Sequence, residues 1–168
     1  NLTITLNGKA STSKSTTAKQ NADAIDYYGP IEIKSFTVGT IPASGGTISS
    51  GNVSYLQVAY YVSGRTVDIT NGATISYSTE VTASSLGTTE KAKSKVGDLT
   101  VSVTLHGYTD TETVPVYQEA NAITSYSDIS LTTLTANDIP ASGGTISTGG
   151  ISASQTVFYT SGQNRVGD

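Results

Sequence analysis

The strongest constraint on the fold is a nine-residue stretch that occurs twice. Residues 41–49 read Ile-Pro-Ala-Ser-Gly-Gly-Thr-Ile-Ser, and residues 139–147 repeat them without a change. The offset of 98 residues is close to the length of one β-sandwich domain. Proline fixes φ and lacks an amide donor, and a glycine pair tolerates positive φ. The motif therefore predicts a turn between strands.

The same offset aligns side chains on both flanks of the motif. Apolar character is kept even where the identity changes. The aligned pairs include Ile31 with Ile129, Ile33 with Leu131, Phe36 with Leu134, Gln57 with Gln155, Tyr60 with Phe158 and Tyr61 with Tyr159. Chance recurrence of a common turn would not carry matched flanks, so we expect two copies of one core.

The beginning of the chain matches the end of a copy. Residues 1–8, Asn-Leu-Thr-Ile-Thr-Leu-Asn-Gly, are similar to residues 98–107, allowing for a small length difference in the strand. We therefore predict that residues 1–25 form the C-terminal strands of one repeat. Residues 26–123 would form a complete domain, and residues 124–168 the N-terminal part of a further repeat.

The last residues suggest how the two partial copies are related. Residues 164–168 resemble residues 94–98, which lead into the penultimate strand of the full copy. This predicts that the final copy skips the stretch corresponding to residues 67–94. The fragments at the two termini would then complete one sandwich, either within one chain or between neighbouring chains; otherwise the termini are cut edges of a longer repeat array. A half-sandwich alone would leave an apolar face and a strand edge open.

Period-two alternation places the strands. Leu2, Ile4 and Leu6 alternate with threonine, and Asn7-Gly8 favours a type I′ hairpin turn. Residues 10–20 are predicted to return as a polar edge strand, and residues 21–30 to form a linker. Further turns are expected at Ser63-Gly64, Asn71-Gly72 and His106-Gly107, and Pro115 indicates an edge strand. The fold class is all-β, with about seven strands per repeat.

Composition excludes several classes of protein. Apolar residues make up 36% and charged residues 13%, with ten tyrosines, so the chain is not of the disordered type. The net charge of −4, without a basic cluster, argues against nucleic acid as a partner. There is no apolar run long enough for a membrane span. The chain contains no cysteine and no methionine, and we interpret it as a mature product or a segment of a longer protein.

No catalytic, cofactor-binding or metal-binding residue is predicted, and we expect the protein not to be an enzyme and to need no cofactor. His106, the only histidine, is expected to be a turn residue beside Gly107. The aspartates are scattered and are expected to be solvated, with interdomain calcium held by Asp26 or Asp128 as the alternative. For an isopeptide crosslink between a lysine and an asparagine, the sequence indicates no set of a lysine, an asparagine and an acidic residue.

The aromatic residues have two interpretations. Tyr60, Tyr61, Phe158 and Tyr159 match between copies and are expected to pack in the core on one face. Exposed tyrosines such as Tyr27, Tyr28 or Tyr108 would be able to stack on sugar rings, which makes surface glycans an alternative partner.

The chain resembles a known family in its closing strands. Val-Gly-Asp-Leu-Thr-Val-Ser-Val at residues 96–103, a glycine turn, and Val-Pro-Val-Tyr-Gln-Glu-Ala-Asn at residues 114–121 are similar to bacterial immunoglobulin-like repeats. These include relatives of the BACON domain in Bacteroidetes surface proteins and domains that decorate phage capsids and tail fibres. The resemblance implies tandem immunoglobulin-like β-sandwiches on a bacterial cell surface or a phage virion.

The function implied is structural or adhesive. Such modules serve as spacers, as adhesion domains or as polymer subunits, and the expected partner is the chain itself, head to tail or through neighbouring repeats. The alternatives are a carbohydrate-binding surface module and a phage decoration protein.

Overall fold

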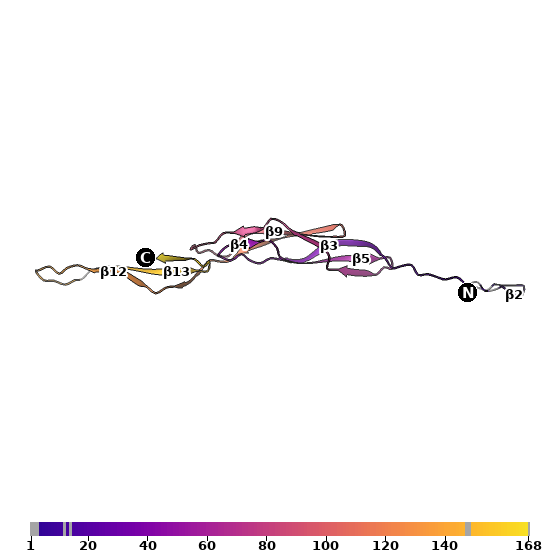
Figure 1. The fold of residues 1–168 in the computed structure, drawn as a ribbon, viewed down its shortest axis with the longest axis horizontal. Coiled ribbons are helices and arrows are strands. Elements are labelled where there is room, and N and C mark those ends of the chain that lie inside the picture. Colours follow the sequence, from indigo (N-terminus) through magenta and orange to yellow (C-terminus); the bar gives the residue numbers. More distant parts are fainter. Residues whose placement is uncertain (1–3, 12, 14, 147–148, 168) are drawn as a thin grey trace.

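The computed structural model describes residues 4–11, 13, 15–146 and 149–167, and these residues form strands, turns and loops without a helix. The molecule is long and thin, with the short strand β2 (Lys9–Ala10) at one end and strands β12 (Ser130–Ala136) and β13 (Gly149–Tyr159) toward the other (Figure 1). The all-β prediction is confirmed. Within the described residues, no helix has the length and apolar character that crossing a membrane requires.

The central unit, residues 25–118, contains eight strands, one more than the number expected. One sheet has the order β3-β5-β6 and another has the order β10-β9-β7, while β4 and β8 form a separate short pair. The strands are β3 (Ile25–Thr37), β4 (Gly46–Ile48), β5 (Asn52–Tyr61), β6 (Thr66–Ile69), β7 (Thr74–Tyr77), β8 (Val81–Ala83), β9 (Ser94–Leu105) and β10 (Tyr108–Gln118).

The core lies between these sheets, in an arrangement consistent with a β-sandwich. Leu99, Val101 and Val103 alternate along β9 and are fully buried. They belong to one cluster with Ile31 and Phe36 of the opposite sheet. Since alternate side chains of a strand point to the same face, the Leu-Thr-Val-Ser-Val pattern directly produces this core.

A short parallel bridge closes the central unit beside the repeated motif. The amide of Ile41 donates to the Tyr117 carbonyl at 2.8 Å, and the amide of Glu119 donates to the Ile41 carbonyl at 2.8 Å. The buried Gln118 side chain donates to the carbonyls of Pro42 at 3.2 Å and Ser84 at 2.8 Å. The first copy of the motif is thus held to the last strand of its own unit.

The hairpin prediction for Asn7-Gly8 is confirmed. β1 (Thr5–Leu6) pairs with β2 (Lys9–Ala10), and the two turn residues have φ of 51° and 75°. Positive φ at both central residues is what a type I′ turn requires.

Two predicted boundaries near the N-terminus are wrong. The predicted edge strand over residues 10–20 is represented only by Lys9–Ala10, and residues 13 and 15–24 have no strand. This Ser/Thr/Lys-rich segment has no apolar face to bury against its own chain. The predicted linker over residues 21–30 ends earlier, because β3 already begins at Ile25. A register shift between Tyr28 and Ile31 accommodates Pro30, which has no amide to donate.

The C-terminal sheet consists of four strands. β13 (Gly149–Tyr159) pairs with β11 (Ile123–Tyr126), β12 (Ser130–Ala136) and β14 (Asn164–Gly167). The pairing repeats that of β5 with its neighbours: Gln155 faces Gly167 in β14, as Gln57 faces Ile69 in β6. The predicted skip within the last copy is therefore wrong, because β14 takes the register of β6 without an interruption.

Candidate functional site

The C-terminal sheet exposes the side chains that are core residues in the central unit. We call this surface the open face, which consists of Ile129, Leu131, Leu134, Ile139 and Ile151. Leu134 is 72% exposed, whereas its counterpart Phe36, 98 residues earlier, is 5% exposed. Ile129 and Ile139 are 69% and 53% exposed, and their counterparts Ile31 and Ile41 are buried.

The contrast does not come from a different pairing of the strands. Leu131 pairs with Ala153 and Leu134 with Ile151, with a register shift between them. In the central unit the corresponding positions pair in the same way, with the same kind of shift. The difference is that β9 and β10, together with Tyr77 of β7 and Val81 of β8, pack over the sheet in the central unit, whereas no described residue covers the open face.

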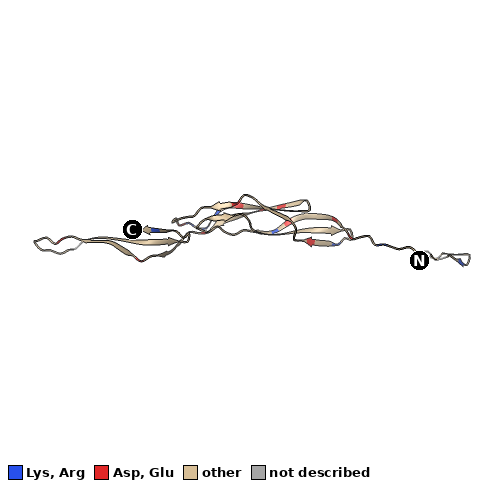
Figure 2. Cartoon of the chain, in the orientation of Figure 1, with Lys and Arg blue, Asp and Glu red and all other residues tan. Residues whose placement is uncertain are grey.

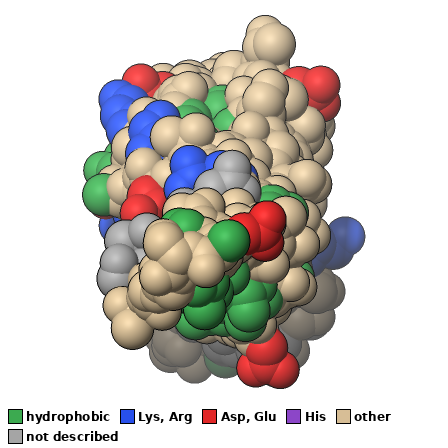
Figure 3. All heavy atoms as spheres, turned by 90° about the vertical axis from the view of Figure 1, so that its left-hand side faces the viewer, with side chains coloured by type: hydrophobic (Ala, Val, Ile, Leu, Met, Phe, Trp, Pro, Cys, Tyr) green, Lys and Arg blue, Asp and Glu red, His purple; other side chains and the backbone are tan. Residues whose placement is uncertain are grey.

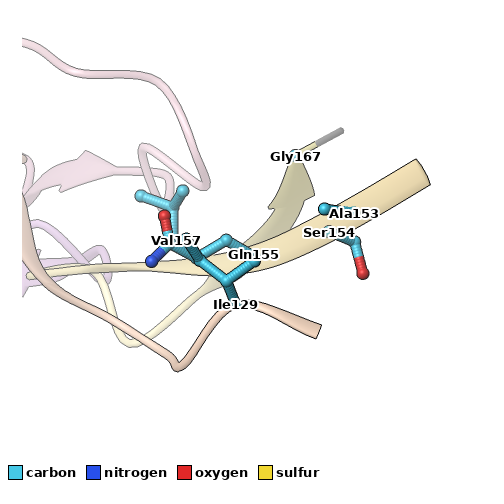
Figure 4. Close-up of a pocket in the computed structure, with 6 residues that line it drawn as sticks. All are labelled: Ile129, Ala153, Ser154, Gln155, Val157 and Gly167. Atoms are coloured by element: carbon cyan, nitrogen blue, oxygen red, sulfur yellow. The ribbon is translucent and has the colours of Figure 1, made fainter. Parts of the chain in front are cut away.

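A hollow lies beside Ile129 of the open face, along residues 153–157 of β13. Figure 4 shows the residues that line an open hollow of about 280 Å³, which are Ile129, Ala153, Ser154, Gln155, Val157 and Gly167. The counterpart of Gln155 is Gln57, which is fully buried. Seen from this end of the molecule, hydrophobic side chains gather into a patch at the surface (Figure 3). The hollow therefore marks the space that core side chains fill in the central unit.

A second set of exposed apolar residues lies at the opposite end of the molecule. The N-terminal arm, described at residues 4–11, 13 and 15–24, carries Ile4 and Leu6, which are 63% and 73% exposed. Its hairpin repeats the geometry of the turn between β9 and β10, where His106 and Gly107 have φ of 47° and 83°.

The arm enters β3 through the same hydrogen bonds that connect the central unit to the C-terminal sheet. The Val62 amide donates to the Ala24 carbonyl at 3.0 Å, and the Thr160 amide donates to the Ala122 carbonyl at 2.9 Å.

A side chain adds a hydrogen bond to each of these two connections, which we call joints. The Ser63 amide donates to Asp23 Oδ1 at 3.2 Å, and the Ser161 amide donates to Asn121 Oδ1 at 2.9 Å. The two joints therefore share one backbone hydrogen bond and one side-chain acceptor, with Asp23 at the position of Asn121.

Asp23 was not singled out from the sequence, although its offset from Asn121 was available as a signal. It also lies 3.4 Å from Arg65 Nε. Hydrogen bonds from Ser63, together with the charge of Arg65, hold the pKa of the Asp23 carboxyl below its ordinary value. Other charged residues are scattered along the molecule (Figure 2).

The prediction that His106 is a turn residue is confirmed. Its ring stacks on Tyr28 with centroids 3.6 Å apart, and its Nδ1 lies 2.8 Å from Oε1 of Gln57. Both neighbours hold the ring against the central unit.

The tyrosines proposed for sugar stacking lie on strands rather than loops. Tyr27 and Tyr28 belong to β3, and Tyr27 stacks on Tyr60 at 4.5 Å. Tyr108 begins β10 and is 42% exposed. The expected core role holds for Tyr159, which is buried, but Phe158 remains 37% exposed.

The acidic residues considered for calcium do not converge. Asp26 and Asp128 are both exposed. Among the residues that the structure describes, no group of three metal-ligating side chains comes together.

Comparison with protein families, with characterised proteins and with solved structures found no match to this chain.

Proposed function

We propose that this chain is a structural, non-catalytic module of an extracellular array or fibre, built from tandem immunoglobulin-like β-sandwiches. Residues 26–123 would be one complete domain, residues 1–25 the closing strands of a preceding one, and residues 124–168 the opening strands of a following one. Its task would be to extend, link or display on a bacterial cell surface or a phage virion.

The observation that carries this proposal is the end-to-end arrangement of the parts. The arm joins the central unit at one end, and the C-terminal sheet lies beyond its other end (Figure 1). A module of this kind adds its whole length to an array, as repeat proteins with nearest-neighbour contacts do.

The hydrogen bonding of the central unit is also suited to bearing load. Tension would pull Ile41 through β3 toward one end and Gln118 toward the other. The parallel bridge between them would then be loaded along the strand direction, so that its hydrogen bonds resist together. Such a geometry supports a role as a tether.

The test is to locate the protein on the particle that carries it. Antibodies against residues 26–123, applied to intact cells or virions, should label the outside without permeabilisation. An antibody against a known interior protein provides the control. Labelling that appears only after permeabilisation would rule out the proposed function.

A further inference from the structure

We propose that the open face binds the N-terminal arm of a second copy of this chain, so that copies join head to tail. This inference rests on the proposed function and names the partner of its uncovered surface. Four observations support it: the identity of the arm, its joint to β3, its reach and the register that it would take.

The arm is a counterpart of the strands that cover the equivalent sheet. In β9 and β10, Leu105 pairs with Tyr108, and in the arm Leu6 pairs with Lys9 in the same register around a turn of the same φ signs. Ile4 and Leu6 share one face, as Val103 and Leu105 do. The arm therefore presents apolar side chains with the same spacing as those of β9, and no such strand covers the open face in the single chain.

The joint between the arm and β3 indicates which strands of a sandwich the arm corresponds to. Ala24 and Asp23 accept hydrogen bonds from the two residues that follow β5, as Ala122 and Asn121 accept them from the two residues that follow β13. The arm therefore stands to the central unit as β10 stands to the C-terminal sheet. It is thus placed as the closing strands of a sandwich that precedes the central unit. In an assembly, that sandwich is completed by the C-terminal sheet of another copy.

The arm cannot complete the open face of its own chain. If residues 4–20 form two strands, only residues 21–24 remain as a connection, and four residues span at most about 14 Å. The arm joins β3 at the end away from the open face (Figure 1), and the 13 residues of β3 extend about 40 Å. The connection is too short for the arm to reach the open face of its own chain, so an arm bound to this face comes from another copy.

The central unit predicts the register of the contact. The bridge of Ile41 with Tyr117 and Glu119 transfers, at the offset of 98, to Ile139 of one copy and to Lys19 and Asn21 of the other. The Gln20 side chain would then donate to the Pro140 carbonyl, as Gln118 donates to Pro42. Ile139 would be buried in the contact, as Ile41 is.

The geometry predicts open chains of molecules. The arm and the open face are different surfaces at opposite ends of the molecule, so each added copy leaves one of each free (Figure 1). Heterologous contacts that do not close produce filaments.

Two variants test this inference on the full chain. The donor variant carries Ile4→Asp and Leu6→Asp, and the acceptor variant carries Ile129→Asp and Leu134→Asp. All four side chains are more than 60% exposed in the single chain, so the substitutions should not disturb its fold. Circular dichroism melting of each variant checks this point.

Light scattering across a dilution series gives the result. The wild-type mass should rise with concentration above 17.3 kDa, and each variant alone should stay at that mass. An equimolar mixture should give a species of twice the mass and nothing larger, because it contains one intact donor and one intact acceptor. A wild-type chain that stays monomeric, or a donor variant that still associates through its open faces, would overturn the inference.

A disulfide test fixes the register. The chain has no cysteine, so Gln20→Cys with Ile139→Cys should give a ladder of crosslinked oligomers under oxidation. Ser50→Cys with Ile139→Cys is the matched control, since Ser50 lies on an exposed loop of the central unit. Equal crosslinking in both pairs would contradict the proposed register.

The proposed function and the proposed head-to-tail assembly can be refuted by different results. A chain that labels the outside of the particle but remains monomeric would retain the proposed function and lose this inference. Assembly in solution by a protein confined to the interior would do the reverse.

Discussion

The two copies allow a large apolar side chain to be truncated to alanine at equivalent positions of the same chain, once in a core and once on the open face. Phe36→Ala removes a side chain that is 5% exposed, and Leu134→Ala removes its counterpart, which is 72% exposed. Truncating a buried phenylalanine costs about 3–5 kcal/mol in the free energy of unfolding. An exposed position should change it by less than about 0.5 kcal/mol.

Although Leu134→Ala should have little effect on the stability of the single chain, it should weaken the association of copies. If the arm of a second copy buries this side chain to the extent seen for Phe36, about two thirds of its surface leaves water. Full burial of a leucine contributes about 1.5–3 kcal/mol, so the contact should lose about 1–2 kcal/mol in Leu134→Ala. The dissociation constant should then rise roughly 5- to 30-fold.

Urea unfolding followed by circular dichroism measures the first effect, and light scattering against concentration measures the second. Phe36→Ala should lower the midpoint of unfolding, while Leu134→Ala should leave the midpoint of the central unit unchanged and weaken association. Equal destabilisation of the monomer by both variants would refute the reasoning, because it would mean that Leu134 is already packed in the single chain.

Two further predictions concern the central unit, and one concerns Asp23 of the arm. Gly51→Ala should destabilise it by about 1–3 kcal/mol in urea unfolding, because the added methyl group would collide with the Thr37 carbonyl; an unchanged midpoint would contradict this packing. Gln57→Leu should cost about 1–3 kcal/mol in the same assay, since a buried carbonyl loses its donor. For Asp23, whose pKa is lowered, the stabilisation of its joint is present above the unfolded pKa of about 4 and is lost as pH falls through the folded value. An NMR titration should therefore give a midpoint below 3.8 for the Ser63 amide, and a midpoint at or above that value would show that the contact is absent in solution.

Several strands of the central unit were predictable because they carry a local signal, whereas the short strands β4 and β8 were not predicted as regular strands. The alternation along β9 and the His106-Gly107 turn both depend on residues adjacent in sequence, and the structure places them as expected. The start of β3 was missed because Gly29 and Pro30 normally mark a break. Here a register shift absorbs them within a strand, and only tertiary pairing with β5 shows this.

The open face was predictable as a set of residues, but its exposure was not. The 98-residue offset identifies Ile129 and Leu134 as core-type positions, and nothing in their own sequence distinguishes them from Ile31 and Phe36. Their exposure depends on what packs above them. The role of residues 164–167 was misjudged for a related reason, since their resemblance to residues 94–97 is local, whereas their pairing with β13 follows from the preceding turn.

The composition of the arm sets the strength of the proposed contact. Its first strand offers Ile4 and Leu6, which match the apolar positions of β9. Its second half offers Ala18 at the position of Val116, which is fully buried in the central unit. Each buried methylene contributes about 0.8 kcal/mol of hydrophobic stabilisation. Because alanine is smaller than valine, the arm should bind the open face less tightly than β10 packs on its own sheet. We therefore expect reversible association, and Ala18→Val should lengthen the filaments at a given concentration. If Ala18→Val leaves the assembly unchanged while Leu6→Asp abolishes it, only the first strand of the arm enters the contact.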